Sequence, residues 1–470
     1  MTRALWLGRT RRVHFVGVGG IGMSGIAELL VNLDYRVSGS DLRASDLTAR
    51  LAALGVEIGI GHDARHVEGA DVVVASSAVA SDNPEVVEAR ARRIPVIPRA
   101  EMLAELMRLR VGIAVAGAHG KTTTTSMVAF MLERAGLDPT AVIGGRLSAF
   151  GSNARLGDGP YMVVEADESD RSFLRLSPAI AVITNIDREH MEAYGSFDRL
   201  MDAFEDFASR VPFYGAIVAC LDDPAVKSLR PRFTRPTITY GFDAEADVRG
   251  SDVETDGESG RCEVTCRAAG GGRTGGRGTL SLPIPGRHNL QNALGAVAVG
   301  LELGVALDHA LAALADFRGV ERRYQTRGLA GGVRVVDDYG HHPTEIAAVL
   351  AAARDGRPSR LVAVFQPHRY TRTRDLLSGF GPALAAADVV VLTDIYPAGE
   401  APLPGVTLEA LADAVRPAVT ELHVVPRIDD VPASVARLSR RGDLVVTLGA
   451  GSVSQVGDRL LDLLRQEGTR

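Results

Sequence analysis

The sequence predicts an α/β protein in three successive domains. Short apolar runs alternate with longer amphipathic or alanine-rich segments, which is the order expected of parallel strands joined by helices. Almost every apolar run ends in glycines or in a cluster of polar residues. A chain of 470 residues suffices for roughly two to four domains, and the alternation begins anew near residues 110 and 319. We therefore expect domains over residues 1–109, 110–318 and 319–470.

The composition argues against two classes of partner. The formal net charge is −6, which provides no basis for binding nucleic acid or an anionic membrane. No run approaches the ~18 apolar residues of a membrane span, and the first residues lack an apolar signal core. The three cysteines are few enough to indicate a reducing compartment, so we expect a cytoplasmic protein. Cys262 and Cys266 share one face of a predicted strand, which favours core packing over metal binding.

The first domain begins with a glycine-rich turn between a strand and a helix. Residues 13–16 are predicted as a strand, residues 17–22 read G-x-G-x-x-G, and the second strand ends at Asp41. This order predicts a Rossmann-like unit in which the helix N-terminus holds a diphosphate. The pattern fits a dinucleotide cofactor or another diphosphate ligand, and it also occurs as a purely structural turn. His62 and His66 are expected at the surface, and no role is assigned to them.

The second domain opens with a phosphate-binding loop. An apolar strand over residues 112–116 leads into Gly117, Gly120 and Lys121, and four threonines then start a helix. Glycines allow backbone N–H groups to approach phosphate oxygens, and the Lys-Thr pair suits a nucleoside triphosphate with Mg²⁺. The loop departs from the usual G-x-x-x-x-G-K-[ST] pattern because Val115 replaces the first glycine. Lys121 is one of only two lysines among 52 basic residues, which argues against a chance glycine-rich turn.

Two further strands of this domain end in polar clusters. Residues 161–164 lead into Glu165 and the acidic stretch to Asp170, and residues 180–184 lead into a segment with His190. Carboxylates beside a phosphate loop are placed to hold Mg²⁺. The same residues also fit a solvated acidic turn and a structural histidine.

Residues 235–285 differ in composition and predict short strands around a glycine-rich tip at 270–278. The next helix begins near Asn289 and Asn292, which share a face because they lie three residues apart. Their amides suit the edge of a nucleotide base, although asparagine is also a common helix cap.

The third domain places histidines and arginines after its strands, where open parallel sheets bind their ligands. Arginines suit a carboxylate, because their N–H groups bind it in pairs. ATP, a diphosphate-bearing substrate and a carboxylate together favour a ligase that works through an acyl phosphate. Six of the 11 histidines stand in loops of this kind, namely His119, His190, His288, His341, His342 and His368.

The chain resembles the Mur ligase family along nearly its whole length. The glycine-rich turn alone is a weak sign, but many motifs stand in the family's order and spacing. They are GVGGIGMSG, SGSD, DNPE, PVIPRAEMLAELMR, GAHGKTTTT, EADESD, TNID followed by HM, GRHNLQN, DDYGHHPTE and QPHRYTRT. The resemblance implies an N-terminal Rossmann-like domain that binds a UDP-sugar, a central P-loop ATP-binding domain and a C-terminal Rossmann-like domain that binds an amino acid.

The resemblance further implies that ATP and Mg²⁺, with two ions, drive the joining of L-alanine to the lactyl carboxylate of UDP-N-acetylmuramate (UDP-MurNAc). The main rival is the related ligase that recycles a murein tripeptide, although QPHRYTRT favours a single amino acid. Two rivals from different classes are a nucleotide-driven assembly factor and an NAD-dependent oxidoreductase. We expect a monomer or a weak homodimer.

The resemblance also assigns residues, position by position. The ATP-binding residues would be Gly117, Ala118, His119, Gly120, Lys121, Thr122, Thr123, Asn289, Asn292, Arg323 and Asp338. The metal ligands would be Thr122, Glu165 and His190, and the catalytic residues Lys121, His190, Arg323 and Asp338. The UDP-MurNAc-binding residues would be Gly17, Gly19, Gly20, Ile21, Gly22, Met23, Asp41, Ser76, Ser77, Arg99 and His119. The L-alanine-binding residues would be Tyr339, His342, His368, Arg369 and Arg372. Ala118 replaces the threonine usual in this branch, which removes a hydroxyl but no backbone donor.

Overall fold

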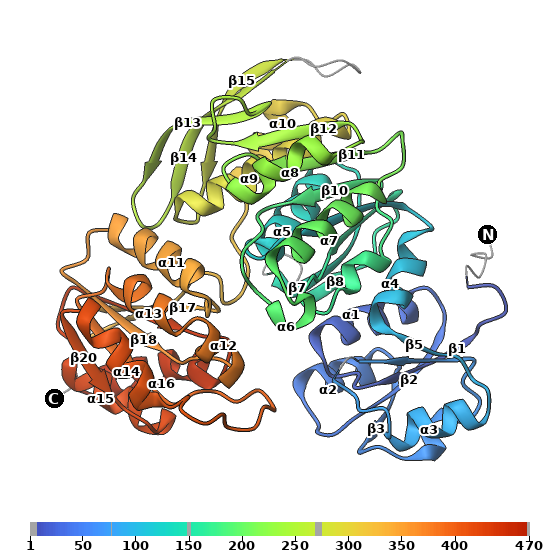
Figure 1. The fold of residues 1–470 in the computed structure, drawn as a ribbon, viewed down its shortest axis with the longest axis horizontal. Helices are drawn as coiled ribbons and strands as arrows, with labels where there is room; N and C mark the ends of the chain where they lie inside the picture. Colours follow the sequence, from blue (N-terminus) through green and yellow to red (C-terminus); the bar gives the residue numbers. More distant parts are fainter. Residues whose placement is uncertain (1–6, 77, 148–151, 268–274, 468–470) are drawn as a thin grey trace. The chain divides into compact units, whose positions relative to one another are not determined.

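The computed structural model describes residues 7–76, 78–147, 152–267 and 275–467. They form three sheets joined by helices, coloured blue, green and orange-red in Figure 1, and this confirms the predicted α/β class. The chain separates into two compact units. The N-terminal unit comprises residues 1–251, 263–279 and 291–314, and the C-terminal unit comprises residues 252–262, 280–290 and 315–470.

The N-terminal sheet has five parallel strands in the order β3-β2-β1-β4-β5. Alternate residues of a strand face opposite sides, so Phe15 packs in the core with α1 and α4 while Val16 packs with α3. The strand order reverses at β1, which is where sheets of this type bind their ligands. The elements are β1 (Arg12–Val16), β2 (Arg36–Asp41), β3 (Glu57–Ile60), β4 (Val72–Ala75), β5 (Val96–Pro98), α1 (Ile21–Asn32), α2 (Asp46–Ala53), α3 (Pro84–Ala91) and α4 (Arg99–Met107).

The central sheet has ten strands in the order β15-β14-β13-β12-β11-β10-β6-β9-β7-β8. Strand β6 pairs in parallel with β9 on one side and with β10 on the other, so the loops after these three strands leave the same edge. The strands are β6 (Val111–Ala116), β7 (Thr140–Leu147), β8 (Ser152–Arg155), β9 (Tyr161–Glu165), β10 (Ile180–Ile183), β11 (Ala216–Cys220), β12 (Thr237–Gly241), β13 (Val248–Thr255), β14 (Gly260–Cys266) and β15 (Gly276–Leu282). The strands predicted around the glycine-rich tip are therefore present, and residues 270–274 of the tip lie outside the described residues.

Helix α7 shows how the helices cover this sheet. Leu200, Phe204 and Phe207 recur at helical spacing and are buried, and Phe207 stacks on Phe173 with ring centroids 5.1 Å apart. The helices between the strands and after them are α5 (Lys121–Arg134), α6 (Met191–Tyr194), α7 (Phe197–Ser209), α8 (Pro224–Leu229), α9 (Arg287–Glu302) and α10 (Leu307–Ala315).

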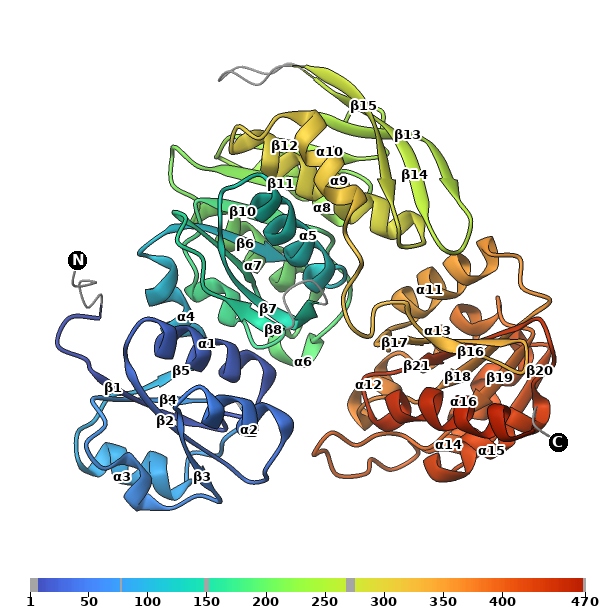
Figure 2. The ribbon, with the colours of Figure 1, turned by 180° about the vertical axis from the view of Figure 1, so that it is seen from behind.

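The C-terminal sheet has the order β16-β17-β21-β18-β19-β20, and only the β16–β17 pairing is antiparallel among its described pairs. Helices α11, α13 and α14 pack on one face, and α15 and α16 pack on the other (Figure 2). The strands are β16 (Gln325–Ala330), β17 (Val333–Asp338), β18 (Arg360–Phe365), β19 (Val389–Leu392), β20 (Glu421–Val424) and β21 (Asp443–Leu448). The helices are α11 (Pro343–Asp355), α12 (Tyr370–Asp375), α13 (Leu377–Leu384), α14 (Leu408–Val415), α15 (Val431–Leu438) and α16 (Val456–Glu467).

Among the described helices, none combines the length and the apolar composition that crossing a bilayer requires.

The three cysteines lie in strands of the central sheet or at their ends, and all are buried and outside any disulfide. Burial raises the pKa of Cys220 to about 12 and that of Cys266 to about 11. Cys262 and Cys266 both point into the core, as predicted.

Native protein should therefore react with the thiol reagent DTNB far more slowly than unfolded protein, because a thiolate must form and must be reached. We expect less than one equivalent of thiol within minutes at pH 8, and three equivalents in guanidinium chloride. Rapid release of two or three equivalents from native protein would contradict the burial.

Candidate active site

The phosphate loop follows β6 and depends on two glycines with left-handed backbone. Gly117 has φ +137°, and a Cβ there would lie 2.1 Å from Thr184 Oγ1. Gly120 has φ +79° and precedes the first turn of α5, where a Cβ would lie 2.6 Å from Asn292 Oδ1. Both positions need glycine for conformation and for space.

The loop after β10 holds the phosphate loop in shape. Ala118 donates its backbone N–H to the Asn185 carbonyl at 3.1 Å, and His119 donates its N–H to Asn185 Oδ1 at 2.8 Å. The Thr184 hydroxyl donates to the His119 carbonyl at 2.7 Å. Ala118 thus uses only its backbone here, so its missing hydroxyl leaves these contacts intact.

Lys121 lies at the centre of this site. Its ammonium donates to the carbonyls of Gly117 at 2.6 Å and Ala118 at 3.1 Å, and to Glu168 Oε1 at 2.9 Å. Burial on its own lowers the pKa of Lys121, but Glu168, Asp167 and Glu165 outweigh burial and raise it. The lysine therefore carries its charge at neutral pH.

Glu168, Glu189 and His190 form a group suited to a divalent cation. One ligand atom from each lies within 4.8 Å of the others. Glu168 Oε2 is buried and has no hydrogen-bond partner among the described residues, and His190 has a strained φ of +56° at the start of α6. The two carboxylates are of the kind and number that hold Mg²⁺ together with water or phosphate oxygens.

The predicted metal ligands are only partly brought together. His190 belongs to the group above, whereas Glu165 does not. Glu165 Oε2 accepts the N–H of Gly144 at 2.8 Å, and Thr122 lies buried in the first turn of α5. Glu168 and Glu189 were absent from the predicted residues. The signal that could have identified them is their sequence position, since Glu168 lies within EADESD and Glu189 precedes His190.

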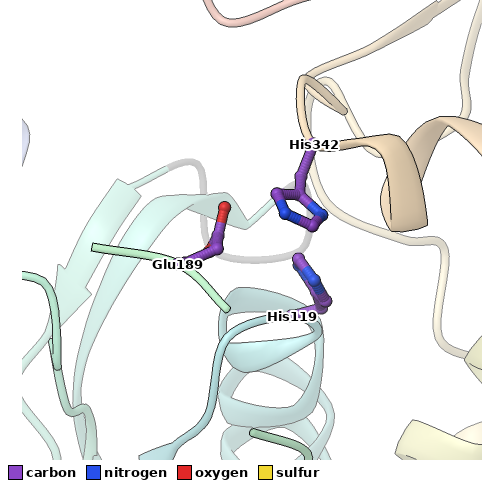
Figure 3. A group of neighbouring side chains, drawn as sticks. All are labelled: His119, Glu189 and His342. Atoms are coloured by element: carbon purple, nitrogen blue, oxygen red, sulfur yellow. The ribbon is translucent and has the colours of Figure 1, made fainter. Parts of the chain in front are cut away.

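Figure 3 shows His119 and Glu189, both from loops of the N-terminal unit, with ligand atoms within 4.8 Å of each other. His119 Nε2 lies 3.0 Å from Asp187 Oδ2. His342, the third side chain drawn, belongs to the C-terminal unit, where its Nδ1 accepts the N–H of Thr344 at 3.3 Å and caps α11.

The threonine run divides into two pairs. Thr122 and Thr123 start α5 and are 6% exposed, whereas Thr124 and Thr125 are fully buried. The Thr125 hydroxyl donates back to the Lys121 carbonyl at 2.8 Å, one helical turn earlier. The second pair therefore packs inside the domain, and only the first pair lies next to the loop.

The glycine-rich turn after β1 lies where the order of the N-terminal sheet reverses. Gly19 donates its N–H to Asp41 Oδ2 at 2.9 Å, so Asp41 holds the turn. A Cβ at Gly22 would lie 2.7 Å from Arg99 Nη1, which places the Arg99 guanidinium beside the start of α1. Gly20 is the N-cap residue of α1, and the start of this helix has no side-chain capping hydrogen bond.

The other predicted UDP-MurNAc-binding residues differ in accessibility. Gly17 has φ +82° and begins the turn, and the backbone N–H of Ser76 donates to the Val16 carbonyl at the end of β1. Met23 is buried in the core and only 2% exposed. Ile21 is the first residue of α1. Ser77 lies outside the described residues.

His62 and His66, which were expected at the surface, are only partly exposed, and both lie beside a buried carboxylate. His66 Nδ1 lies 2.7 Å from the buried Glu85 carboxylate, and His62 Nδ1 lies 3.5 Å from it. Their sequence neighbourhood of glycine and charged residues gave no sign of a buried partner on α3.

Asn289 and Asn292 both belong to α9, but their side chains contact different parts of the chain. Asn289 is the third residue of α9, and its Nδ2 donates to the Pro285 carbonyl at 2.7 Å, so it does not cap the helix by accepting a backbone N–H through this contact. Asn292 lies beside Gly120 of the phosphate loop.

In the C-terminal unit, Asp338 fixes the segment that carries Arg323. Its carboxylate accepts the N–H groups of Tyr324 at 2.7 Å and Gly340 at 2.6 Å. Arg322 and Tyr324 have φ +58° and +49°, and Arg323 Nη1 lies 3.6 Å from Glu345 Oε1. Burial raises the pKa of Asp338 to about 6.

His368 stands at the centre of the predicted amino-acid site. Arg372 Nη1 lies 3.1 Å from its Nδ1, and the ring stacks on Tyr396 with centroids 5.7 Å apart. The His341 ring lies 5.5 Å from the His368 ring. Arg369, with φ +70°, donates its N–H to the Tyr396 carbonyl at 2.8 Å.

The structure thus places His341, rather than His342, next to His368. The ring of Tyr339 packs edge-on against His341, with centroids 5.5 Å apart. Burial lowers the pKa of His341 to about 3 and that of His368 to about 4. Both imidazoles are therefore neutral at pH 7.

Comparison with known proteins gives consistent matches over all three sheets. Residues 12–110 match the model of the Mur ligase family, catalytic domain, residues 115–300 match the Mur ligase middle domain, and residues 322–451 match the Mur ligase, glutamate ligase domain. The UDP-N-acetylmuramate–L-alanine ligase of Anaeromyxobacter sp. strain Fw109-5 is 55% identical over 462 residues, 98% of this chain and 99% of the relative.

Two solved structures show the same fold. The UDP-N-acetylmuramate–alanine ligase of Thermotoga maritima superposes with a TM-score of 0.80 at 30% identity, over 98% of this chain and 100% of that one. A murein peptide ligase of Psychrobacter arcticus has a TM-score of 0.71 at 24% identity, over 97% of this chain and 99% of that one.

Asp338 should make the stability of the protein depend on pH. Its pKa of about 6 in the folded protein exceeds the ~3.9 of an unfolded aspartate, so the stabilisation is complete below pH 4 and is lost as pH rises through 6. Asp338→Asn does not ionise. Its free energy of unfolding, measured in urea, should improve relative to wild type by ~1.4 kcal/mol between pH 5 and pH 7.5. Asp413→Asn, on the exposed face of α14, serves as the control. A difference between Asp338→Asn and wild type that does not change with pH would contradict the assignment.

Proposed function

The chain belongs to the Mur ligase family, and we propose that it joins L-alanine to UDP-MurNAc with ATP, giving UDP-MurNAc-L-Ala, ADP and phosphate. The observation that carries the proposal is 55% identity to a ligase of that name over 98% of the chain. The family uses ATP, and the phosphate loop with the charged, half-buried Lys121 supports its assignment as the ATP site.

The reaction proceeds in two steps. A lactyl carboxylate oxygen forms a bond to the γ-phosphorus while the bond to the β,γ-bridging oxygen breaks, and ADP leaves. The alanine amine then attacks the acyl carbon, the carbon–oxygen bond to the phosphoryl group breaks, and phosphate leaves with its electron pair. The nitrogen loses one proton. Both steps depend mainly on positioning and on neutralising phosphate charge.

Lys121 neutralises that charge. All three ammonium protons are bonded to the loop carbonyls and to Glu168. A γ-phosphate oxygen competes for the bond to Glu168, because phosphate carries more negative charge than a carboxylate. The other two bonds keep the ammonium at the loop while it exchanges partners.

Mg²⁺ is the cofactor that this site fits. Glu168, Glu189 and His190 would hold one ion, and Thr122 and Glu165 are proposed for another beside the loop. A bound ion neutralises phosphate oxygens and orients the γ-phosphoryl group. The partnerless oxygen Glu168 Oε2 supports this assignment, since a buried carboxylate oxygen is otherwise costly.

The remaining substrates are assigned to the other two sheets. The glycine turn after β1, with Arg99, is proposed to hold the UDP diphosphate, and the loops with His368 and Arg372 are proposed to hold L-alanine. His341 and His368 are neutral because burial lowers their pKa values, so a ring nitrogen of either can accept a hydrogen bond from the alanine ammonium and orient it. The roles of Arg323 and Asp338 toward ATP stay a proposal drawn from the family pattern.

A single amino acid is favoured over a tripeptide as the added group. The chain is more similar to the alanine ligase of Thermotoga maritima, with a TM-score of 0.80, than to the murein peptide ligase of Psychrobacter arcticus, with 0.71. We further propose that the protein acts in the cytoplasm as a monomer or weak homodimer, without nucleic acid or membrane.

Phosphate release from ATP, Mg²⁺ and UDP-MurNAc tests the function. We expect release with L-alanine, and weaker release with L-serine and glycine by a factor of roughly 10–200, because one methyl or hydroxyl group changes transition-state binding by ~1–3 kcal/mol. Omitting UDP-MurNAc should abolish release. Release with L-Ala-D-Glu-diaminopimelate but not with L-alanine would identify a tripeptide ligase instead.

Lys121→Arg should lower kcat by at least about a hundredfold although the charge is kept, since a planar guanidinium cannot replace the compact ammonium among three acceptors. Lys227→Arg is the matched control, because Lys227 is the other lysine of the chain and pairs with Asp243 near the surface. Steady-state kinetics of both variants decide the matter. Near-normal turnover by Lys121→Arg would remove Lys121 from the mechanism.

A further inference from the structure

The N-terminal sheet contains a buried carboxylate that none of these roles uses. Glu85 lies in the first turn of α3 and is fully buried. The Ser40 hydroxyl donates to Glu85 Oε2 at 2.6 Å, and the N–H of Asp63 donates to Oε1 at 3.2 Å. The carboxylate therefore ties the end of β2 and the loop after β3 to α3.

Three histidines surround the same group. His66 Nδ1 lies 2.7 Å from Glu85 Oε1, His14 Nε2 lies 3.3 Å from Oε2, and His62 Nδ1 lies 3.1 Å from Ser40 Oγ. An ionised carboxylate only accepts, so His14 and His66 donate to it. Burial on its own would raise the pKa of Glu85, but the hydrogen bonds of His14, Ser40 and His66 lower it to about 2.

Ser40 connects this cluster to the glycine-rich turn. Its carbonyl accepts the N–H groups of Gly17 at 2.9 Å and Val18 at 3.0 Å. The next residue, Asp41, accepts the N–H of Gly19 at 2.9 Å. The end of β2 thus accepts hydrogen bonds from three successive amides of the turn. Glu85 in turn accepts the hydroxyl of Ser40, whose carbonyl binds two of those amides.

We propose that Glu85 is a positioning residue for UDP-MurNAc, which acts through Ser40 to keep the backbone of residues 17–19 in the shape that receives the diphosphate. This inference rests on the proposed function. Glu85 itself touches no substrate. Its buried charge, satisfied from several elements at once, fixes the Ser40 hydroxyl more firmly than a neutral acceptor does.

A residue that only stabilises the domain and a residue that positions the turn differ in their effects. Loss of stability alone lowers the amount of folded enzyme and leaves each KM unchanged. Loss of positioning raises the KM and Kd for UDP-MurNAc and leaves those for ATP and L-alanine within about twofold. It also loosens the turn locally.

The test compares Glu85→Gln and Ser40→Ala with wild type. We expect the Kd for UDP-MurNAc, measured by calorimetry, to rise about tenfold or more in Glu85→Gln and in the same direction in Ser40→Ala. Amide hydrogen exchange over residues 13–24 should become faster in both variants, with the other strands unchanged. Asp443→Asn is the control, because Asp443 is equally buried and paired with Arg360 in the C-terminal sheet. It should leave UDP-MurNAc binding unchanged.

Each outcome decides a separate question. Wild-type protein that does not bind UDP-MurNAc would overturn the proposed function. Wild-type binding together with unchanged affinity and exchange in the variants would overturn only the role of Glu85. If Glu85→Gln does not fold, the result for Ser40→Ala decides the role of Glu85, because this substitution removes only the hydroxyl that links Glu85 to the strand holding the glycine-rich turn. Equal changes in the KM of all three substrates would also overturn the positioning role.

Discussion

The candidate active site depends on one constraint, which is that neighbouring parallel strands end at the same edge of a sheet. Strand β6 lies between β9 and β10, so the phosphate loop, the acidic loop after β9 and the loop with His190 must meet. No long-range sequence signal is needed to bring Lys121 and Glu168 together, since the sheet does so. The same constraint gathers the glycine turn with Asp41, and it leaves His341 and His368 at one edge, after two strands that both pair with β21.

Carboxylates at strand ends perform a second common task in this molecule. Asp41 and Asp338 each accept backbone N–H groups of a loop, at 2.6–2.9 Å. Such hydrogen bonds to a charged acceptor are stronger than neutral ones. The loops therefore owe their shape to side chains from neighbouring strands, and a loop residue can change while its conformation persists, as Ala118 illustrates.

Sequence reasoning predicted the strands and the loops after them, because strand and turn signals are local. It did not predict which side chain of a loop faces its neighbours. His342 precedes Pro343 and caps α11, and a residue before a helix-starting proline is a recognisable cap. That signal would have assigned His342 to the helix cap and favoured His341 as the histidine of the predicted amino-acid site. The partner of Glu85 could not be found in this way, because His14 and His66 approach it from other elements.

The strained backbone on both sides of Arg323 has a consequence for binding. Left-handed conformations at Arg322 and Tyr324 are unfavourable by ~1–3 kcal/mol each, and the hydrogen bonds of Asp338 hold the segment there. Folding has therefore already removed the backbone freedom of this stretch. Ordering the backbone of one residue opposes binding by ~1–2 kcal/mol, and a ligand of Arg323 meets a backbone for which folding has already met that entropic penalty.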